Sequence, residues 1–221
     1  MRGPLAAVRP VQPQDRPARW PIPAGESATG RYLSLTIAVE VPSPVRAYFA
    51  EALTGVDHEG FVVMPSDEYH LSLDQFRVPE DGGLSVVAQL LDDLAELWPL
   101  PPCWVVGFER WNLKPDRLHA RFLVVRHGFG RAWVNFVVEL RKRLRSAGFR
   151  TRRRHVIPHV TLMRSRDYCP LGWQSKPTLP PIRWAPASIV ILASDPGPPR
   201  RHIVHHRSLL GGGAGACVEG V

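Results

Sequence analysis

The sequence is poor in cysteine and has no long apolar run. It holds 3 cysteines among 221 residues, and none of them forms a CxxC pair. This excludes a disulfide framework and a zinc ribbon, and it favours a reducing compartment. No stretch of about 18 apolar residues is present to cross a membrane, and the amino-terminal segment lacks the apolar centre of a secretory signal. We therefore expect a soluble, cytoplasmic protein.

Acidic residues are outnumbered by basic ones. Asp and Glu total 20 against 28 for Lys and Arg, which gives a formal net charge of +8 and a sequence pI near 10.1. A surplus of this size favours polyanionic ligands such as nucleic acid. Totals do not locate a basic patch, and many soluble proteins are basic. Charge alone therefore leaves a nucleic-acid partner and an ordinary basic surface equally open.

The two ends of the chain differ in composition from its middle. Residues 1–30 are rich in proline and arginine without hydrophobic periodicity, which predicts a disordered arm. Residues 211–221 are rich in glycine and predict a flexible tail. The segment 31–210 between them has the size of one domain, so a single cleft is expected. No protein partner is implied, and we expect a monomer.

Apolar spacing predicts a mixture of strands and helices. Residues 33–41 alternate between apolar and polar or small side chains, as in a strand with one buried face, whereas 84–98 show helical spacing. In full, the spacing predicts strands at 33–41, 61–64, 69–73, 104–111, 118–125, 159–163, 188–194 and 202–206, helices at 44–54, 84–98 and 133–145, Ser43 as an N-cap, and a hairpin turn at 114–116. This order predicts an α+β sheet domain rather than a doubly wound parallel one.

A short pattern of histidine, aliphatic, hydroxyl and aliphatic residue occurs twice, as HLSL at 70–73 and as HVTL at 159–162. Alternate residues of a strand share a face, so His70 would lie beside Ser72 and His159 beside Thr161. One copy is more often a histidine packed at a sheet edge than a catalytic group. Two copies are much harder to explain by chance, and they favour chemistry.

Two histidines and two hydroxyls around one anion suit phosphoryl transfer. One neutral imidazole can deprotonate an attacking water or hydroxyl, while the second, protonated, delivers a proton to the leaving oxygen. The hydroxyls and an arginine would bind the remaining phosphate oxygens, a task that oriented donors can perform without a metal. We expect no metal and no cofactor. Which of His70 and His159 is the acid and which the base stays open.

With these motifs the chain resembles the two-histidine (2H) phosphoesterases, and within them the bacterial and archaeal RNA 2′,3′-cyclic phosphodiesterases, also called 2′-5′ RNA ligase-like proteins. The resemblance covers about residues 31–210. It rests on the segments LSLTIAVEVPSPVRAYF, MPSDEYHLSL and AGFRTRRRHVIPHVTLMRS. Two positions depart from the family pattern: Tyr69 replaces an aliphatic residue before the first histidine, and no arginine directly follows the first motif in DQFR at 74–77.

The resemblance implies a fold of two pseudo-symmetric βα lobes with antiparallel sheets that form a V-shaped cleft, with one motif in each lobe. It implies hydrolysis of a 2′,3′-cyclic phosphate at an RNA or nucleotide terminus to a 2′-phosphate, catalysed by His70 and His159. Ser72 and Thr161 would hold the phosphate, assisted by Arg164. Related branches act on other cyclic phosphates, on 2′-5′ linkages or on RNA 3′ ends, and 2′-5′ RNA ligation is a further candidate activity.

A basic run precedes the second motif. It consists of Arg150, Arg152, Arg153 and Arg154, shortly after the basic end of the third predicted helix. The run could guide an RNA backbone toward His159, or it could be a solvated helix end and loop, and we hold both interpretations equally. The aromatic residues Trp111, Phe122 and Trp133 could stack on a base, but their spacing more often indicates core positions.

Two further alternatives remain. His155 and His159 have the spacing of two zinc ligands on a helix, but Pro158 between them argues against a helix. A cluster of histidines at 202–206 has no carboxylate or cysteine at ligand spacing and favours a surface strand. The rival to an enzyme is a non-catalytic RNA-binding module that uses His70 and His159 only as phosphate contacts. Arginine or lysine would serve that purpose equally well, so two histidines that titrate near neutral pH favour catalysis.

Overall fold

The computed structural model describes residues 31–54, 56, 59–80, 82–98, 100–111, 119–151, 157–170, 182–194 and 201–209. The elements in chain order are β1 (Tyr32–Glu40), α1 (Ser43–Ala52), β2 (Val62–Val63), the 3₁₀ turn η2 (Ser66–Glu68), β3 (His70–Pro79), α2 (Gly83–Leu97), β4 (Cys103–Trp111), β5 (His119–Gly128), α3 (Arg131–Ser146), β6 (His159–Pro170), β7 (Arg183–Trp184), β8 (Ser188–Ser194) and β9 (Arg201–Ser208).

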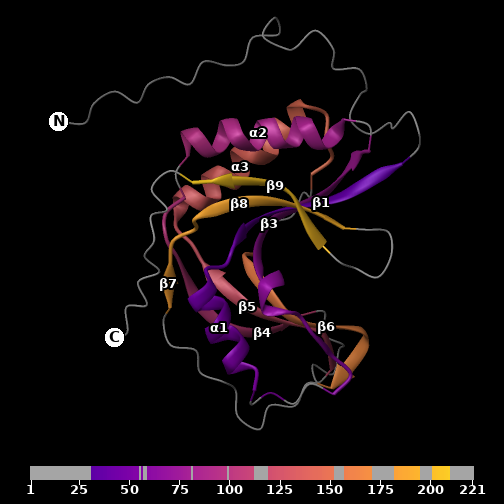
Figure 1. Ribbon diagram of the computed structural model, residues 1–221, viewed down its shortest axis with the longest axis vertical. Helices are drawn as coiled ribbons and strands as arrows, with labels where there is room; N and C mark the ends of the chain where they lie inside the picture. Colours follow the sequence, from indigo (N-terminus) through magenta and orange to yellow (C-terminus); the bar gives the residue numbers. More distant parts are fainter. Residues whose placement is uncertain are drawn as a thin grey trace, which may run out of the picture.

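The strands form one nine-stranded sheet in which every described pairing is antiparallel. Its order is β7-β4-β5-β6-β3-β1-β8-β9, and β2 pairs with β6 at Met163 and Arg164, beyond the point where β3 pairs with β6. The two motif strands, β3 and β6, are therefore neighbours at its centre. Figure 1 shows that the sheet divides there into two lobes, one of β1, β3, β8 and β9 and the other of β2, β4, β5, β6 and β7. The predicted α+β class is confirmed.

Each lobe is covered by a helix that follows a strand of the other lobe. Helix α3 follows β5 but lies with α2 over the lobe that contains β3, where Arg141 of α3 forms an ion pair with Asp74 of β3. Helix α1 follows β1 but lies against the lobe of β4 and β5 (Figure 1), where Phe49 packs edge-on against His127 of β5. The helices thus bury the outer faces of the lobes and leave the motif residues on the inner faces.

Strand β1 shows how far the alternation in the sequence holds. Leu35, Ile37 and Val39 are fully buried in the main core, as the alternation predicts. Thr36 and Ala38, which the one-face pattern placed on an exposed face, are buried as well. Both residues are buried because β1 is an interior strand of a curved sheet, with β3 on one side and β8 on the other. The prediction of one exposed face is therefore wrong for this strand.

Most predicted elements are present, with corrected ends. Ser43 is not the N-cap of α1, because Pro42 precedes the helix and the Ser43 hydroxyl instead accepts a hydrogen bond from Arg46. β2 is shorter than the predicted strand at 61–64, and β3 and β6 run well beyond 73 and 163. The two-residue strand β7 was not predicted. The arm, the tail and the turn at 114–116 lie outside the described residues. Within the described part, no helix is long and apolar enough to span a membrane.

Candidate active site

One backbone pairing brings the two motifs together. Leu71 of β3 pairs with Val160 of β6 in antiparallel register, and both side chains are fully buried. Alternation then turns the residues on either side of this pair toward the opposite, inner face of the sheet. In an antiparallel register these neighbours lie across from each other as His70 with Thr161 and as Ser72 with His159. Each histidine therefore lies beside the hydroxyl of the other motif, around a local pseudo-twofold axis.

Both imidazole rings are held in the same way. Nδ1 of His70 lies 2.7 Å from the carbonyl oxygen of Glu68, and Nδ1 of His159 lies 2.8 Å from the carbonyl oxygen of Ile157. A carbonyl oxygen only accepts a hydrogen bond, so Nδ1 donates in both rings. Proton uptake and release then take place at Nε2. This equivalence lets either ring serve as base or as acid.

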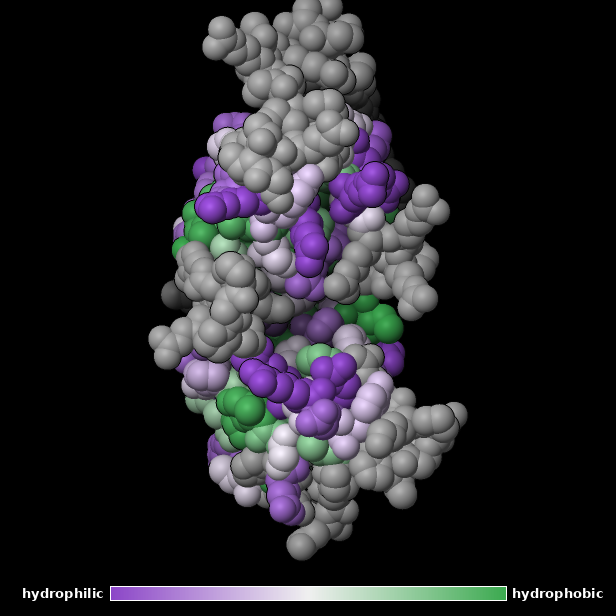
Figure 2. All heavy atoms as spheres, turned by 90° about the vertical axis from the view of Figure 1, so that its right-hand side faces the viewer, coloured by the Kyte–Doolittle hydropathy of each residue, from purple (hydrophilic) through white to green (hydrophobic). Residues whose placement is uncertain are grey.

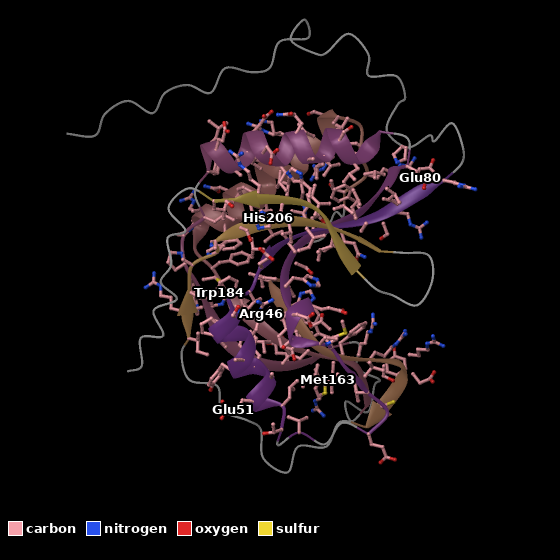
Figure 3. The ribbon with its side chains drawn as sticks, in the orientation of Figure 1. Arg46, Glu51, Glu80, Met163, Trp184 and His206 are labelled. Atoms are coloured by element: carbon pink, nitrogen blue, oxygen red, sulfur yellow. The ribbon has the colours of Figure 1, made fainter. Side chains whose placement is uncertain are left out.

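The support of His70 extends to α1. Glu68, whose carbonyl accepts from His70, belongs to the 3₁₀ turn η2. Arg46 of α1, labelled in Figure 3, donates to the carbonyl oxygen of Asp67 in the same turn. Tyr69, the departure from the family pattern, is buried, and burial raises its pKa to about 12. It therefore acts as a neutral core residue behind the motif, in the manner of the aliphatic residue that it replaces.

A β-bulge falls at the last residue of each motif and changes which face the next residues take. Opposite β1 the register skips Leu73, and opposite β5 it skips Leu162. Met163 is consequently buried, while Arg164 is partly exposed and joins the face of the second motif. Bulges near functional sites commonly redirect side chains in this way. The bulge thus brings Arg164 to the face of His159 and Thr161, where uninterrupted alternation would have turned it away.

The bulge in β3 brings Gln75 to a position that the sequence analysis did not single out. Gln75 follows His70 by five residues, as Arg164 follows His159. The order of buried and partly buried residues is the same at 70–75 in β3 as at 159–164 in β6. Gln75 therefore takes the place in the first lobe that Arg164 takes in the second. The equal offset from each histidine was the available signal, but it is informative only once the paired bulges are known.

The two histidines have neighbours of opposite charge. Glu40 of β1 is the register partner of His70, and its carboxylate accepts from the hydroxyl of Ser188 and lies 3.2 Å from Nε2 of His206. Figure 3 labels His206 on β9, the strand beyond β8. These side chains extend the polar inner face of the first lobe away from His70.

Around His159 the corresponding neighbour is basic. Arg126 of β5 is the register partner of His159, and it forms a 2.7 Å ion pair with Glu109. The same carboxylate accepts from the indole nitrogen of Trp111, whose ring lies 4.1 Å from the His159 ring, centroid to centroid. Trp111 therefore packs on the second histidine and limits its movement. Sequence spacing favoured a core position for this tryptophan, and the structure instead leaves it half-buried at the site.

A third histidine lies behind the second motif. His127 is buried between Phe49 and Trp184, with ring centroids 5.9 Å and 5.7 Å away. The pKa of His127 is lowered to about 4, chiefly by burial and to a smaller extent by the nearness of His159, against the opposing effect of the hydrogen bond to the Val125 carbonyl. Within the described part, its Nε2 has no partner. His127 is therefore a neutral residue of the core.

No described contact places the remaining predicted site residues beside the two motifs. Arg150 is exposed directly after Phe149, which packs against Phe76 on the helix-covered face of the first lobe. Arg152, Arg153, Arg154 and His155 lie outside the described residues. Trp133 is fully buried, with its indole nitrogen bonded to the Pro101 carbonyl. No group of three or more His, Cys, Asp or Glu side chains able to hold a metal ion occurs among the described residues.

The surface agrees with a site between the lobes. Figure 2 shows a recess across the middle of the molecule, with hydrophilic residues inside it and along its lower rim. The recess lies between the upper and lower lobes of Figure 1. A polar inner surface of this kind suits a charged ligand rather than an apolar one.

Comparison with known proteins identifies the fold. No protein-family model matches the sequence, and no curated protein matches it significantly. The structure is similar to that of TT0787 of Thermus thermophilus, with a TM-score of 0.64 and 21% identity over 80% of this chain and 97% of that one. It is similar to E. coli LigT, with a TM-score of 0.54 and 18% identity over 80% and 98%. A protein described as a phosphoesterase gives 0.56 and 18% over 81% and 99%. The chain therefore has the 2H phosphoesterase fold that the resemblance implied.

Proposed function

We propose that this chain is a metal-independent phosphodiesterase that opens a 2′,3′-cyclic phosphate at the end of an RNA or nucleotide and leaves a 2′-phosphate. The observation that carries the proposal is the Leu71–Val160 pairing, which sets two equivalently oriented imidazoles and two hydroxyls on one inner face. The fold shared with a phosphoesterase supports it.

The reaction needs one proton removed and one delivered. The neutral histidine takes a proton from water at Nε2 as the water oxygen bonds to phosphorus. The bond from phosphorus to the 3′ oxygen breaks, and the protonated histidine delivers its Nε2 proton to that oxygen. Because Nδ1–H of His70 and of His159 is already bound to a carbonyl, both proton transfers fall to the nitrogens that face the substrate.

The other inner-face groups act on the phosphate. Ser72 and Thr161 donate hydroxyl hydrogens to the oxygens that do not react, and Arg164 balances the charge that grows on them in the transition state. Preorganised donors of this kind are each worth on the order of 100-fold in rate. LigT, which shares the fold, has been crystallised with phosphate and with 3′-AMP. That chemistry supports a phosphate ester as the ligand here.

The test is hydrolysis, in EDTA, of an oligoribonucleotide that ends in a 2′,3′-cyclic phosphate. We expect turnover by the wild-type chain with a 2′-phosphate product. His70→Ala and His159→Ala should each lower kcat by about 100- to 10,000-fold, the usual range for a lost general acid or base, with oligonucleotide affinity largely kept. His205→Ala is the matched control, because His205 faces α2 and bonds to Asp92 on the helix-covered side of the first lobe.

Two results would contradict the proposal. Equal losses of affinity and turnover in both histidine variants would mean that the side chains only bind phosphate, as in an RNA-binding module. No turnover by the wild-type chain despite tight binding would exclude this substrate. The 2′-5′ linkage and the RNA 3′ end are then the substrates to measure in the same variants. Attack of a 5′ hydroxyl on the 2′,3′-cyclic phosphate, which breaks the bond from phosphorus to the 3′ oxygen and leaves a 2′-5′ linkage, would reveal ligation.

A further inference from the structure

An exposed tryptophan lies flat on the backbone at the end of the second lobe. Trp104 of β4 pairs with Gly128 of β5. A Cβ atom on Gly128 would fall 2.3 Å from the indole nitrogen of Trp104, so a side chain at this position would displace the ring. The ring is nevertheless not part of the core, because 41% of the residue is exposed, whereas Trp133 and Trp184 are buried. The indole ring of Trp104 thus packs on the backbone at Gly128 while the residue stays partly exposed.

This tryptophan is on the same face of the sheet as the second catalytic motif. Arg126 is the register partner of His159, and Gly128 follows Arg126 by two residues and so shares its face. His127 between them points into the core. At ordinary sheet spacings, two strands across and one row of side chains along, the Cα atoms of Trp104 and His159 are roughly 12 Å apart.

The neighbours of Trp104 in the same row are an apolar and a basic residue. The His127 amide donates to the Pro158 carbonyl, which continues the β5–β6 ladder and sets Ile157, 51% exposed, next to Gly128. On the other side Trp104 pairs with Arg183 of β7, which is exposed and forms no ion pair within the part of the chain that the structure describes. The row therefore offers an aromatic plane flanked by an apolar side chain and a guanidinium.

This combination recognises single-stranded nucleic acid. Bases stack on exposed aromatic rings whatever their sequence, and a nearby cation holds the backbone phosphate. A scattered exposed apolar residue needs no explanation, but a ring lying on a glycine beside an uncompensated arginine has the composition of a stacking platform. The net charge of +8 agrees with a polyanion.

We propose that Trp104, Ile157 and Arg183 form a second nucleotide subsite, in which the base next to the terminal nucleotide stacks on Trp104 and its phosphate binds Arg183. The terminal nucleotide itself lies against His159 and Trp111. The substrate is then an RNA strand rather than a mononucleotide. This inference rests on the proposed function for its direction, since the site of reaction defines which nucleotide is terminal.

The experiment compares two substrates and one binding probe. The substrates are an oligoribonucleotide with a 2′,3′-cyclic phosphate end and a nucleoside 2′,3′-cyclic monophosphate. The probe is a labelled single-stranded oligoribonucleotide, followed by fluorescence anisotropy without turnover. The variants are Trp104→Ala, Gly128→Ala, their combination and Arg183→Gln. Val138→Ala, an exposed apolar residue on the helix α3, is the control.

Trp104→Ala should lower the ratio of kcat/KM for the oligonucleotide to kcat/KM for the mononucleotide by about 5- to 150-fold, the range for one lost base stack. Gly128→Ala should give a similar loss by lifting the ring. It should add little when Trp104 is already alanine, because the two residues act as one platform. Arg183→Gln should reduce the salt dependence of probe binding by about one phosphate contact.

Equal losses on both substrates, or unchanged probe affinity in Trp104→Ala, would overturn the subsite. So would a change in sedimentation of Trp104→Ala, which would make the row a contact between copies of this chain. Because the probe is not cleaved, its binding tests the subsite independently of whether the chain catalyses the reaction. Weaker probe binding by Trp104→Ala in a chain that hydrolyses no cyclic phosphate would keep the platform and remove only the chemistry.

Discussion

At the scale of single residues, the two lobes differ most in how they surround their histidines. His70 has Glu40 as its register partner, and His159 has Arg126 as its register partner and the ring of Trp111 against it. None of these contacts is visible in the sequence, where Glu40 and His70 are 30 positions apart. The two histidines that we propose as catalytic could be singled out from a short repeat, whereas their electrostatic surroundings depend on register.

His127 carries a prediction about stability and pH. Its folded-state pKa is about 4 because of burial, below the ordinary value of 6.5 that the unfolded chain retains. Between these two values the unfolded chain binds a proton that the folded chain does not. Stability is therefore full above pH 6.5, falls as the pH drops toward 4, and loses about 3 kcal/mol in total from this group. Urea unfolding measured from pH 7 to pH 4 would show the decline.

Removal of the imidazole gives the control for this prediction. His127→Leu should flatten the pH dependence between pH 6.5 and 4 by the amount that His127 contributes. His206→Gln, a substitution at an exposed histidine, should keep most of the slope. An unchanged slope in His127→Leu would show that other groups cause the acid sensitivity.

At the scale of elements, local patterns predicted most of the strands and helices. The strand β8 matches its predicted range of 188–194, and α2 lies within one residue of the predicted 84–98. Both are defined by apolar spacing within the segment itself. The two-residue strand β7 escaped prediction and β2 was predicted too long, because neither contains enough residues to show a period. They exist because longer partners, β6 for β2 and β4 for β7, pair with them.

The bulges at the ends of the two motifs mark where prediction from sequence ends. A bulge is a mismatch between two strands, so it is defined by the register of distant segments and not by either segment alone. The motif repeat predicted that His70 and His159 face one ligand, and the pairing of Leu71 with Val160 turns both away from the core. The inner-face position of Gln75 could not be predicted, because uninterrupted alternation would have turned it toward the core.

The link between α3 and β3 carries a second stability prediction. Arg141 and Asp74 form a buried ion pair with a 2.7 Å distance between Nε and Oδ2. Arg141→Met would leave the Asp74 carboxylate buried without its cation, and this should lower the free energy of unfolding by about 3–5 kcal/mol. Urea unfolding at pH 7 is the measurement.

The control for the buried pair is an exposed one. Arg207 pairs with Glu96 between β9 and α2, so Arg207→Met should cost less than about 1 kcal/mol. The combination of Asp74→Leu and Arg141→Met should recover much of the loss, because no charge is then left buried. An Arg141→Met variant no less stable than Arg207→Met would mean that water reaches the pair in solution.

At the scale of the whole molecule, the chain builds two similar lobes and joins them through a single described backbone pairing. The helices α1 and α3 each cover the lobe opposite to the strand that precedes them. This exchange ties the lobes together through the chain itself. Among the described strands, by contrast, the two lobes pair with each other only at the motif strands, and Figure 2 shows a recess between the lobes.

Pseudo-symmetry of the lobes predicts that Gln75 and Arg164 occupy equivalent positions relative to the phosphate. Arg164→Gln should weaken the binding of inorganic phosphate by on the order of 10- to 100-fold, the worth of a charged hydrogen bond. Gln75→Arg in that background should restore part of the affinity, because its guanidinium would enter the same space from the first lobe. Isothermal titration with phosphate measures both steps.

Recovery of phosphate affinity by Gln75→Arg tests whether the position of the added charge matters, rather than the net charge of the chain. Arg207→Gln removes one positive charge from the helix-covered side of the first lobe and should change phosphate affinity little. If Gln75→Arg raised phosphate affinity no more than a basic substitution elsewhere on the surface, the bulge in β3 would not aim its residue at the site. Recovery by Gln75→Arg would instead show that both lobes address one phosphate, as the shared burial sequence of β3 and β6 indicates.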